Sequence, residues 1–166
     1  MEKTRVINKE KIIYVVGEKG VGKTSYVNRL NNGQFTKNYF PTNSQIISNM
    51  IINGKNGGDN GNNKHIKIVD VGNIFIRGPI DGLVLMFSLD DIASYKKLKN
   101  WVKQFDMLDN KIPVVVVGNK SDRSNARKLE GETYHRKINA PYYEISCKLN
   151  KNCNKPLLYL IKKLIN

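Results

Sequence analysis

A strand, a glycine-rich turn and a helix are expected to follow one another over residues 12–30. The apolar, β-branched run Ile12–Val16 is typical of a buried strand. It leads into Gly17-Glu18-Lys19-Gly20-Val21-Gly22-Lys23-Thr24, which matches the pattern G-x-x-x-x-G-K-[ST] at every position. The glycines let successive backbone N–H groups turn inward around a phosphate chain, and the helix beginning near Lys23 directs its positive end at the same phosphates. The sequence therefore predicts a site for a nucleoside phosphate.

Two residues of this loop have predicted contacts to the phosphates and their metal ion. Lys23 is expected to reach the β- and γ-phosphates, and the Thr24 hydroxyl is expected to ligate Mg²⁺. Asp70 ends another apolar run, and a carboxylate at that place beside such a loop commonly holds Mg²⁺, usually through water. Taken alone, Asp70 is equally typical of a turn residue with a local hydrogen-bond partner.

A second motif, Asn119-Lys120-Ser121-Asp122, follows the apolar run Pro113–Val117. The Asp122 carboxylate can accept hydrogen bonds from the ring N1–H and the 2-amino group of guanine. Adenine offers neither donor, so the unpaired carboxylate would penalise it. Lys120 can lay its methylenes along the base, and Asn119 can bridge the base and the phosphate loop. These residues predict guanine rather than adenine.

A third segment, Ser146-Cys147-Lys148, follows the strand expected at Tyr142–Ile145. A backbone N–H there, that of Cys147, can donate to guanine O6, which again discriminates against the 6-amino group of adenine. The predicted cofactors are therefore GTP or GDP together with Mg²⁺.

Strand-like and helix-like segments alternate along the chain, which predicts an α/β fold with a mainly parallel sheet and helices on both faces. The remaining strands are expected near Gln45–Ile52, His65–Val69 and Leu83–Ser88. One helix should be capped by Asp90 or Asp91 and run to about Met107, and another should begin near Lys155. The predicted apolar faces consist of Ala93, Leu98, Trp101, Val102 and Phe105 in the first helix, and of Leu157, Leu158, Ile161, Leu164 and Ile165 in the last. Trp101 is expected to be a core residue, and residues 53–63 to form a flexible hairpin tip without a function of their own.

The 166 residues suit a single domain, and their formal net charge of +14 is unusual. The charge fits either a nucleic-acid footprint or a lysine-rich surface caused by AT-rich codons. We favour codon bias because no nucleic-acid-binding motif accompanies the charge, and an acidic protein partner agrees with both interpretations. The N-terminus lacks an apolar signal region and no 18-residue apolar run occurs, so we expect a location in the cytoplasm or nucleus without a membrane anchor. We also expect a monomer.

The order of these motifs resembles a small Ras-superfamily GTPase, and more specifically the Ran type. The segments that carry the Ran resemblance are Asn100-Trp101, His135-Arg136-Lys137, Tyr142-Tyr143-Glu144-Ile145-Ser146 and Lys155-Pro156-Leu157-Leu158-Tyr159-Leu160. The similarity extends over roughly residues 10–165 and implies one G domain, with the P-loop small-GTPase fold, over residues 1–166. A mostly parallel six-stranded sheet, GTP hydrolysis and a role in nucleocytoplasmic transport are implied as well.

The resemblance also implies roles for particular residues. Phe35 matches the aromatic that packs against guanine, and Thr42 the switch threonine that meets Mg²⁺ and the γ-phosphate. By spacing alone, Phe35 is equally a loop anchor and Thr42 a solvated loop residue. His135, Arg136 and Lys137 match a basic segment that faces acidic partners, here Ran-type transport receptors or binding proteins. The implied catalytic residues are Lys23 and Thr42, and the implied metal ligands are Thr24, Thr42 and Asp70. The implied GTP-binding set is Gly17, Lys19, Gly20, Val21, Gly22, Lys23, Thr24, Ser25, Phe35, Thr42, Asp70, Gly72, Asn119, Lys120, Asp122, Ser146, Cys147 and Lys148.

Several departures from the Ran pattern affect the expected chemistry. Lys19 replaces a glycine beside the γ-phosphate, and Asp70-Val71-Gly72-Asn73 lacks the glutamine that positions water. The connection after Asp70 is about eight residues shorter than in the family, enough to remove most of the switch II helix. The acidic C-terminal tail is missing too. These features predict a diverged viral or parasitic copy with weakened hydrolysis.

Three functions remain open at this stage. The first is a GTP-dependent switch, for which we expect weakened hydrolysis although a competent, cycling GTPase remains its rival. The second is a non-hydrolysing, GTP-bound decoy or scaffold for Ran partners. The third, an ATP-dependent phosphotransferase, is disfavoured by Asn119-Lys120-x-Asp122.

Overall fold

The computed structural model describes residues 10–37, 45–52, 64–72, 78–105, 112–126 and 134–165. Thr42, Asn73 and the expected hairpin tip 53–63 lie outside these ranges. The strands are β1 Lys11–Val16, β2 Ile46–Ile52, β3 Lys64–Asp70, β4 Gly82–Ser88, β5 Val114–Asn119 and β6 Tyr142–Glu144. The helices are α1 Lys23–Asn32, α2 Ile92–Lys96, α3 Leu98–Phe105, α4 Tyr134–Lys137 and α5 Asn154–Ile165.

The strands form one six-stranded sheet in the order β2-β3-β1-β4-β5-β6. Only the β2–β3 pair is antiparallel, and the other neighbours are parallel. β4 is buried along its whole length because helices cover both faces of the sheet there, so its sequence is a continuous apolar run. These observations confirm the predicted α/β class and the mostly parallel sheet.

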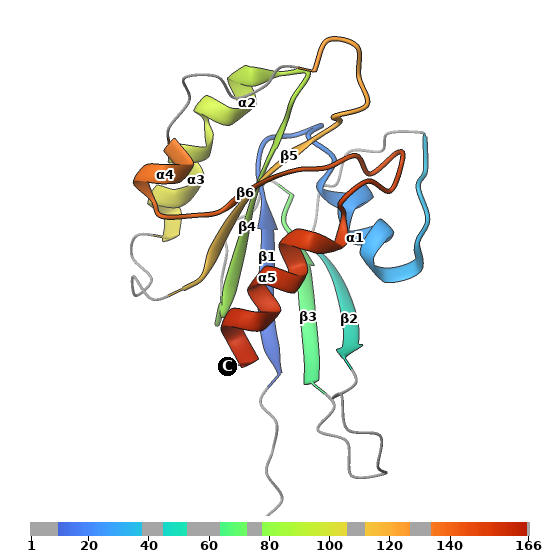
Figure 1. Cartoon of the computed structure of the whole chain (residues 1–166). Coiled ribbons are helices and arrows are strands. Elements are labelled where there is room, and N and C mark those ends of the chain that lie inside the picture. The colour runs from blue at the N-terminus through green and yellow to red at the C-terminus, as the bar shows by residue number, and fades with distance from the viewer. Residues whose placement is uncertain are drawn as a thin grey trace, which may run out of the picture.

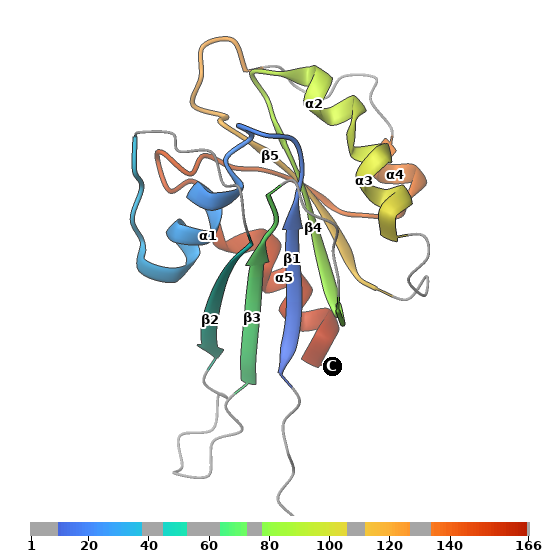
Figure 2. The ribbon, with the colours of Figure 1, turned by 180° about the vertical axis from the view of Figure 1, so that it is seen from behind.

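Helices pack on both faces of the sheet. On one face α1 and α5 form a core cluster with alternate residues of β1, β3, β4 and β5 (Figure 1). On the other face α2, α3 and α4 contribute to a second core cluster. Figure 2 shows the molecule turned by 180°, from behind. None of the helices in the described ranges is both long and apolar enough to span a lipid bilayer.

The prediction of one continuous helix up to Met107 is wrong. Two helices, α2 and α3, are separated at Lys97, and the described helix ends at Phe105. Asp91 is the N-cap, since its side chain accepts a hydrogen bond from the Ala93 N–H. Ala93 is exposed and Tyr95 is buried, because at about 100° per residue Ala93 lies off the apolar stripe that runs through Tyr95 and Leu98. The side chain of Phe105 lies outside those described.

The apolar face predicted for α5 is also wrong at one position. Leu158 is 55% exposed, whereas Leu157 and Leu160 are buried. Successive helical residues are turned by about 100°, so a core stripe through Leu157, Leu160, Ile161 and Leu164 leaves Leu158 outside it. The other predicted residues of this face are at least half-buried.

The arrangement of the strands brings the predicted motifs to one edge of the sheet. The glycine-rich loop follows β1, Asp70 ends β3, Asn119 ends β5, and the 146–148 segment follows β6. Because β1, β3, β4, β5 and β6 run parallel, their carboxyl ends lie at the same edge, which is where ligands bind in open α/β sheets.

Candidate functional site

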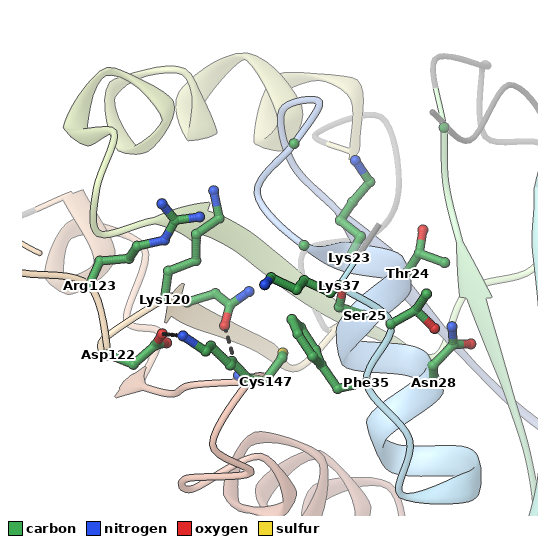
Figure 3. Close-up of a pocket in the computed structure, with 16 residues that line it drawn as sticks. Lys23, Thr24, Ser25, Asn28, Phe35, Lys37, Lys120, Asp122, Arg123 and Cys147 are labelled. Carbon is green, nitrogen blue, oxygen red and sulfur yellow. Dashed lines mark hydrogen bonds and ion pairs between the residues drawn. The ribbon is translucent and has the colours of Figure 1, made fainter. Parts of the chain in front are cut away.

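A cavity of about 470 Å³ lies at this edge of the sheet. Figure 3 shows α1 side chains on one side, Lys120, Asp122 and Arg123 on the other, and Phe35 between them. The lining residues are Gly20, Gly22, Lys23, Thr24, Ser25, Asn28, Phe35, Thr36, Lys37, Gly72, Asn119, Lys120, Asp122, Arg123, Cys147 and Lys148. Its lining therefore includes residues of the glycine-rich loop, of the 119–122 motif and of the 146–148 segment.

Two glycines of the loop after β1 are required by close packing. Gly17 has φ +148°, and a Cβ there would lie 1.9 Å from the Met86 carbonyl oxygen. Gly22 has φ +98°, and a Cβ there would lie 2.4 Å from Asn119 Nδ2. Because side chains at these positions would clash, the loop can approach β4 and Asn119 closely only with glycine. The loop backbone consequently forms one end of the cavity.

Lys23 lies folded over this loop. Its Nζ donates to the carbonyl oxygens of Gly17 at 2.9 Å and Glu18 at 3.2 Å, and only 9% of the residue is exposed. Burial lowers the pKa of Lys23 from its ordinary value, while the charges of Asp70 and Glu18 oppose that shift. A positive charge is thus held inside the loop. A bound anion can replace the two carbonyl oxygens as the hydrogen-bond partner of Lys23 Nζ.

Thr24 and Asp70 form a pair beside the loop. The Thr24 hydroxyl donates to Asp70 Oδ2 at 2.5 Å, and Asp70 is fully buried. The other oxygen, Oδ1, has no hydrogen-bond partner among the residues that the structure describes. Burial raises the pKa of Asp70, and the Thr24 hydrogen bond and the Lys23 charge lower it in part. A buried carboxylate oxygen without a partner next to a hydroxyl is a hard oxygen set, so these residues fit Mg²⁺.

Asn119 connects the two ends of the cavity. Its Nδ2 donates to the Val21 carbonyl at 2.9 Å, and its Oδ1 accepts from the Cys147 N–H at 3.1 Å. The side chain is buried, so these bonds are shielded from water. Asn119 therefore fixes the 146–148 segment to the glycine-rich loop. The Cys147 N–H, which the sequence assigned to guanine O6, is bonded to this side chain.

Asp122 is held from two sides. Its Oδ1 accepts from the Ser146 hydroxyl at 2.5 Å, and its Oδ2 lies 3.9 Å from Lys148 Nζ. Only 8% of the Asp122 side chain is exposed. Lys120, with φ +65°, turns the chain between Asn119 and Asp122, and its Nζ lies 3.3 Å from Asp90. The two predicted base-recognition motifs thus meet in one constrained cluster.

The sequence model of the Ras family matches residues 11–166, almost the whole chain. The chain belongs to the Ras family. Ras-family domains bind guanine nucleotides, generally with Mg²⁺, and have GTPase activity as a class. This membership confirms the predicted Ras-superfamily resemblance and the small-GTPase fold.

Glu18 in the phosphate loop of this Ras-family domain is hydrogen-bonded to residues of α3 and of the α2–α3 junction. Its Oε2 accepts from Lys97 Nζ at 3.1 Å and its Oε1 from Trp101 Nε1 at 3.3 Å. Trp101 packs against the second core cluster, as predicted, and is half-buried. No sequence pattern predicts this contact between the phosphate loop and α3.

Five predicted nucleotide-binding residues of this Ras-family domain are absent from the cavity lining: Gly17, Lys19, Val21, Asp70 and Ser146. Four of them act on their neighbours through the contacts described above. Lys19 is exposed, and Thr42 lies outside the described residues.

Four lining residues were missed by sequence reasoning: Asn28, Thr36, Lys37 and Arg123. Asn28 lies one helical turn after Thr24 and therefore on the same face of α1. Thr36 and Lys37 follow Phe35, and Arg123 follows Asp122. Proximity to a motif residue is the signal that could have found them.

The predicted partner-binding residues of this Ras-family domain lie on α4. His135 Nδ1 is 3.0 Å from the Tyr95 hydroxyl, and the His135 ring is 5.3 Å from that of Tyr142. Burial, with a further contribution from Arg136, lowers the pKa of His135. Arg136 and Lys137 are exposed. A partner surface on α4 would consequently consist mainly of these two cations.

Proposed function

We propose that this Ras-family domain is a Ran-like, Mg²⁺-dependent guanine-nucleotide switch with weakened GTP hydrolysis. The observation that carries this proposal is the Asn119 side chain, which bonds to both the phosphate loop and the base-recognition segment. A nucleotide that fills the cavity can then be read at its base and its phosphates at once.

The residues divide the work between the two ends of the nucleotide. The loop N–H groups and Lys23 bind the phosphate chain, and Asp122 binds the guanine edge. Thr24 and Asp70 are the residues that would hold Mg²⁺, which neutralises charge on the β- and γ-phosphates when bound. The buried carboxylate of Asp122 excludes bases that offer it no donors.

Calorimetry with GDP and ADP, each in excess Mg²⁺, tests guanine recognition. We expect GDP to bind at least about 10²-fold more tightly, since ADP leaves the Asp122 carboxylate without two charge-assisted hydrogen bonds. The nucleotide extracted from the protein as purified should likewise be GDP or GTP. Equal affinities for GDP and ADP would contradict the proposed function.

A non-hydrolysing, GTP-bound decoy or scaffold for Ran partners is the second candidate. It is favoured by the sequence after β3, where no glutamine occurs between Asp70 and Gly82 to position water. Single-turnover hydrolysis by the purified protein separates the two candidates, because a decoy retains its GTP over the time in which a switch turns over.

For either candidate we propose a Ran-type transport receptor or binding protein as the partner. Arg136 and Lys137 are exposed, and the net charge of +14 strengthens the field toward acidic partners. We expect weak, salt-sensitive capture of such a receptor by the GTP-loaded protein in a pull-down.

Two double variants with the same net charge separate local contact from the overall field. Arg136→Glu with Lys137→Glu should abolish capture, whereas Lys162→Glu with Lys163→Glu, an exposed pair on α5, should reduce it less. Equal capture by the GDP- and GTP-loaded forms would show that binding is not gated by nucleotide.

A further inference from the structure

Arg29 on α1 contacts two chain segments that meet at the base end of the cavity. Its Nε donates to the Cys147 carbonyl at 2.9 Å, and its Nη2 donates to the Lys148 carbonyl at 3.1 Å. Its Nη1 donates to the Gly33 carbonyl, and its guanidinium carbon lies 5.8 Å from the centre of the Phe35 ring. One side chain thus makes three hydrogen bonds and a cation–π contact.

These contacts connect two chain segments that line the cavity. Cys147 and Lys148 line it from the segment after β6, and Phe35 lines it from the segment after α1. Arg29 and Cys147 are 118 positions apart in the chain. Arg29 itself is absent from the lining, so it acts on the cavity through these neighbours.

The guanidinium group is suited to this position because of its shape. Its planar fork can bond two successive carbonyls from one side while its face lies over an aromatic ring. An ammonium group is a point charge and cannot reproduce both contacts. The spacing of the Cys147 and Lys148 carbonyls is therefore fixed by a rigid donor.

We propose that Arg29 is a positioning residue for guanine recognition, which sets the 146–148 segment and Phe35 at the spacing that a guanine base requires. This inference rests on the proposed function, since it concerns the same site. It differs from the base-contacting role proposed for Asp122 because Arg29 does not line the cavity.

The test compares Arg29→Met with the parent protein in two measurements. The first is the dissociation rate of a fluorescent N-methylanthraniloyl GDP, which should rise about 10- to 100-fold because the hydrogen bonds of a charged donor are lost. The second is the affinity for GDP and for 2-aminopurine riboside 5′-diphosphate, which lacks the 6-oxygen. The proposed function has the 146–148 segment read that oxygen, so the loss of affinity should be larger for GDP.

Lys162→Met is the matched control. It removes an exposed cation from α5 and should leave both measurements unchanged. Arg29→Lys keeps the charge and the aliphatic stem and should restore only part of the loss. It also replaces Arg29→Met if that variant does not fold. Equal losses for the two nucleotides, or full rescue by lysine, would overturn the positioning role. If instead the parent protein binds GDP no better than ADP, the proposed function itself fails.

Discussion

Replacing Asp122 with alanine is expected to weaken GDP binding by about 10²- to 10⁴-fold. The carboxylate is almost fully buried, so the hydrogen bonds proposed between it and guanine would form in a desolvated site. Two charge-assisted hydrogen bonds, at about 1.5–3 kcal/mol each, give about 3–6 kcal/mol of binding free energy. The variant also loses the Ser146 and Lys148 contacts that fix this wall of the cavity. Isothermal titration with GDP in excess Mg²⁺ measures the effect.

Asp91→Ala is the matched control for Asp122→Ala. Asp91 is also a hydrogen-bond acceptor, here for the Ala93 N–H, but it caps α2 and does not line the cavity. Its loss should lower the free energy of unfolding by about 1 kcal/mol without changing GDP affinity. If Asp122→Ala bound GDP as tightly as the parent protein, guanine would have to be recognised elsewhere.

Intrinsic GTP hydrolysis is expected at or below about 10⁻⁴ s⁻¹, the scale of an unassisted small GTPase. Phosphoryl transfer in such sites depends on positioning a water in line and on stabilising the developing charge. Lys23 can supply charge, but Asn73, the first amide after Gly72, is one methylene shorter than glutamine and differently spaced. Single-turnover hydrolysis of GTP by the purified protein measures the rate.

Lys19→Gly tests whether the unusual lysine contributes to that rate. Lys19 is exposed, and a flexible ammonium does not orient water, so restoring glycine should not accelerate hydrolysis. Asp122→Ala purified in the same way reports any contaminating GTPase. A parent rate many-fold above the expected scale that disappears in Lys19→Gly would contradict this prediction and make Lys19 catalytic.

The fold could be predicted because each motif follows an apolar run of strand length. Once the strands are parallel, their carboxyl ends must meet, so the convergence of Asn119 and Asp70 on the glycine-rich loop follows from chain order. Tyr142–Glu144 is only a short strand, yet the motif after it placed its end within one residue, at Ile145 instead of Glu144.

Contacts that depend on the phase of a helix could not be predicted in the same way. The break at Lys97 has no proline or glycine to announce it, and Ala93 lies off the stripe through Tyr95 and Leu98. Leu158 is apolar but lies off the stripe that the sheet selects. The contacts of Arg29 with the 146–148 segment join positions whose proximity exists only in the folded chain, and no local pattern records it.

The bond between Trp101 and Glu18 gives the protein an optical reporter of its own. Trp101 is the only tryptophan in the chain, so all indole emission comes from a ring whose N–H is bonded to the phosphate loop. A change in that hydrogen bond alters the polarity around the indole and shifts its emission. Movements of the loop can therefore be followed in real time with unlabelled protein and unmodified nucleotide.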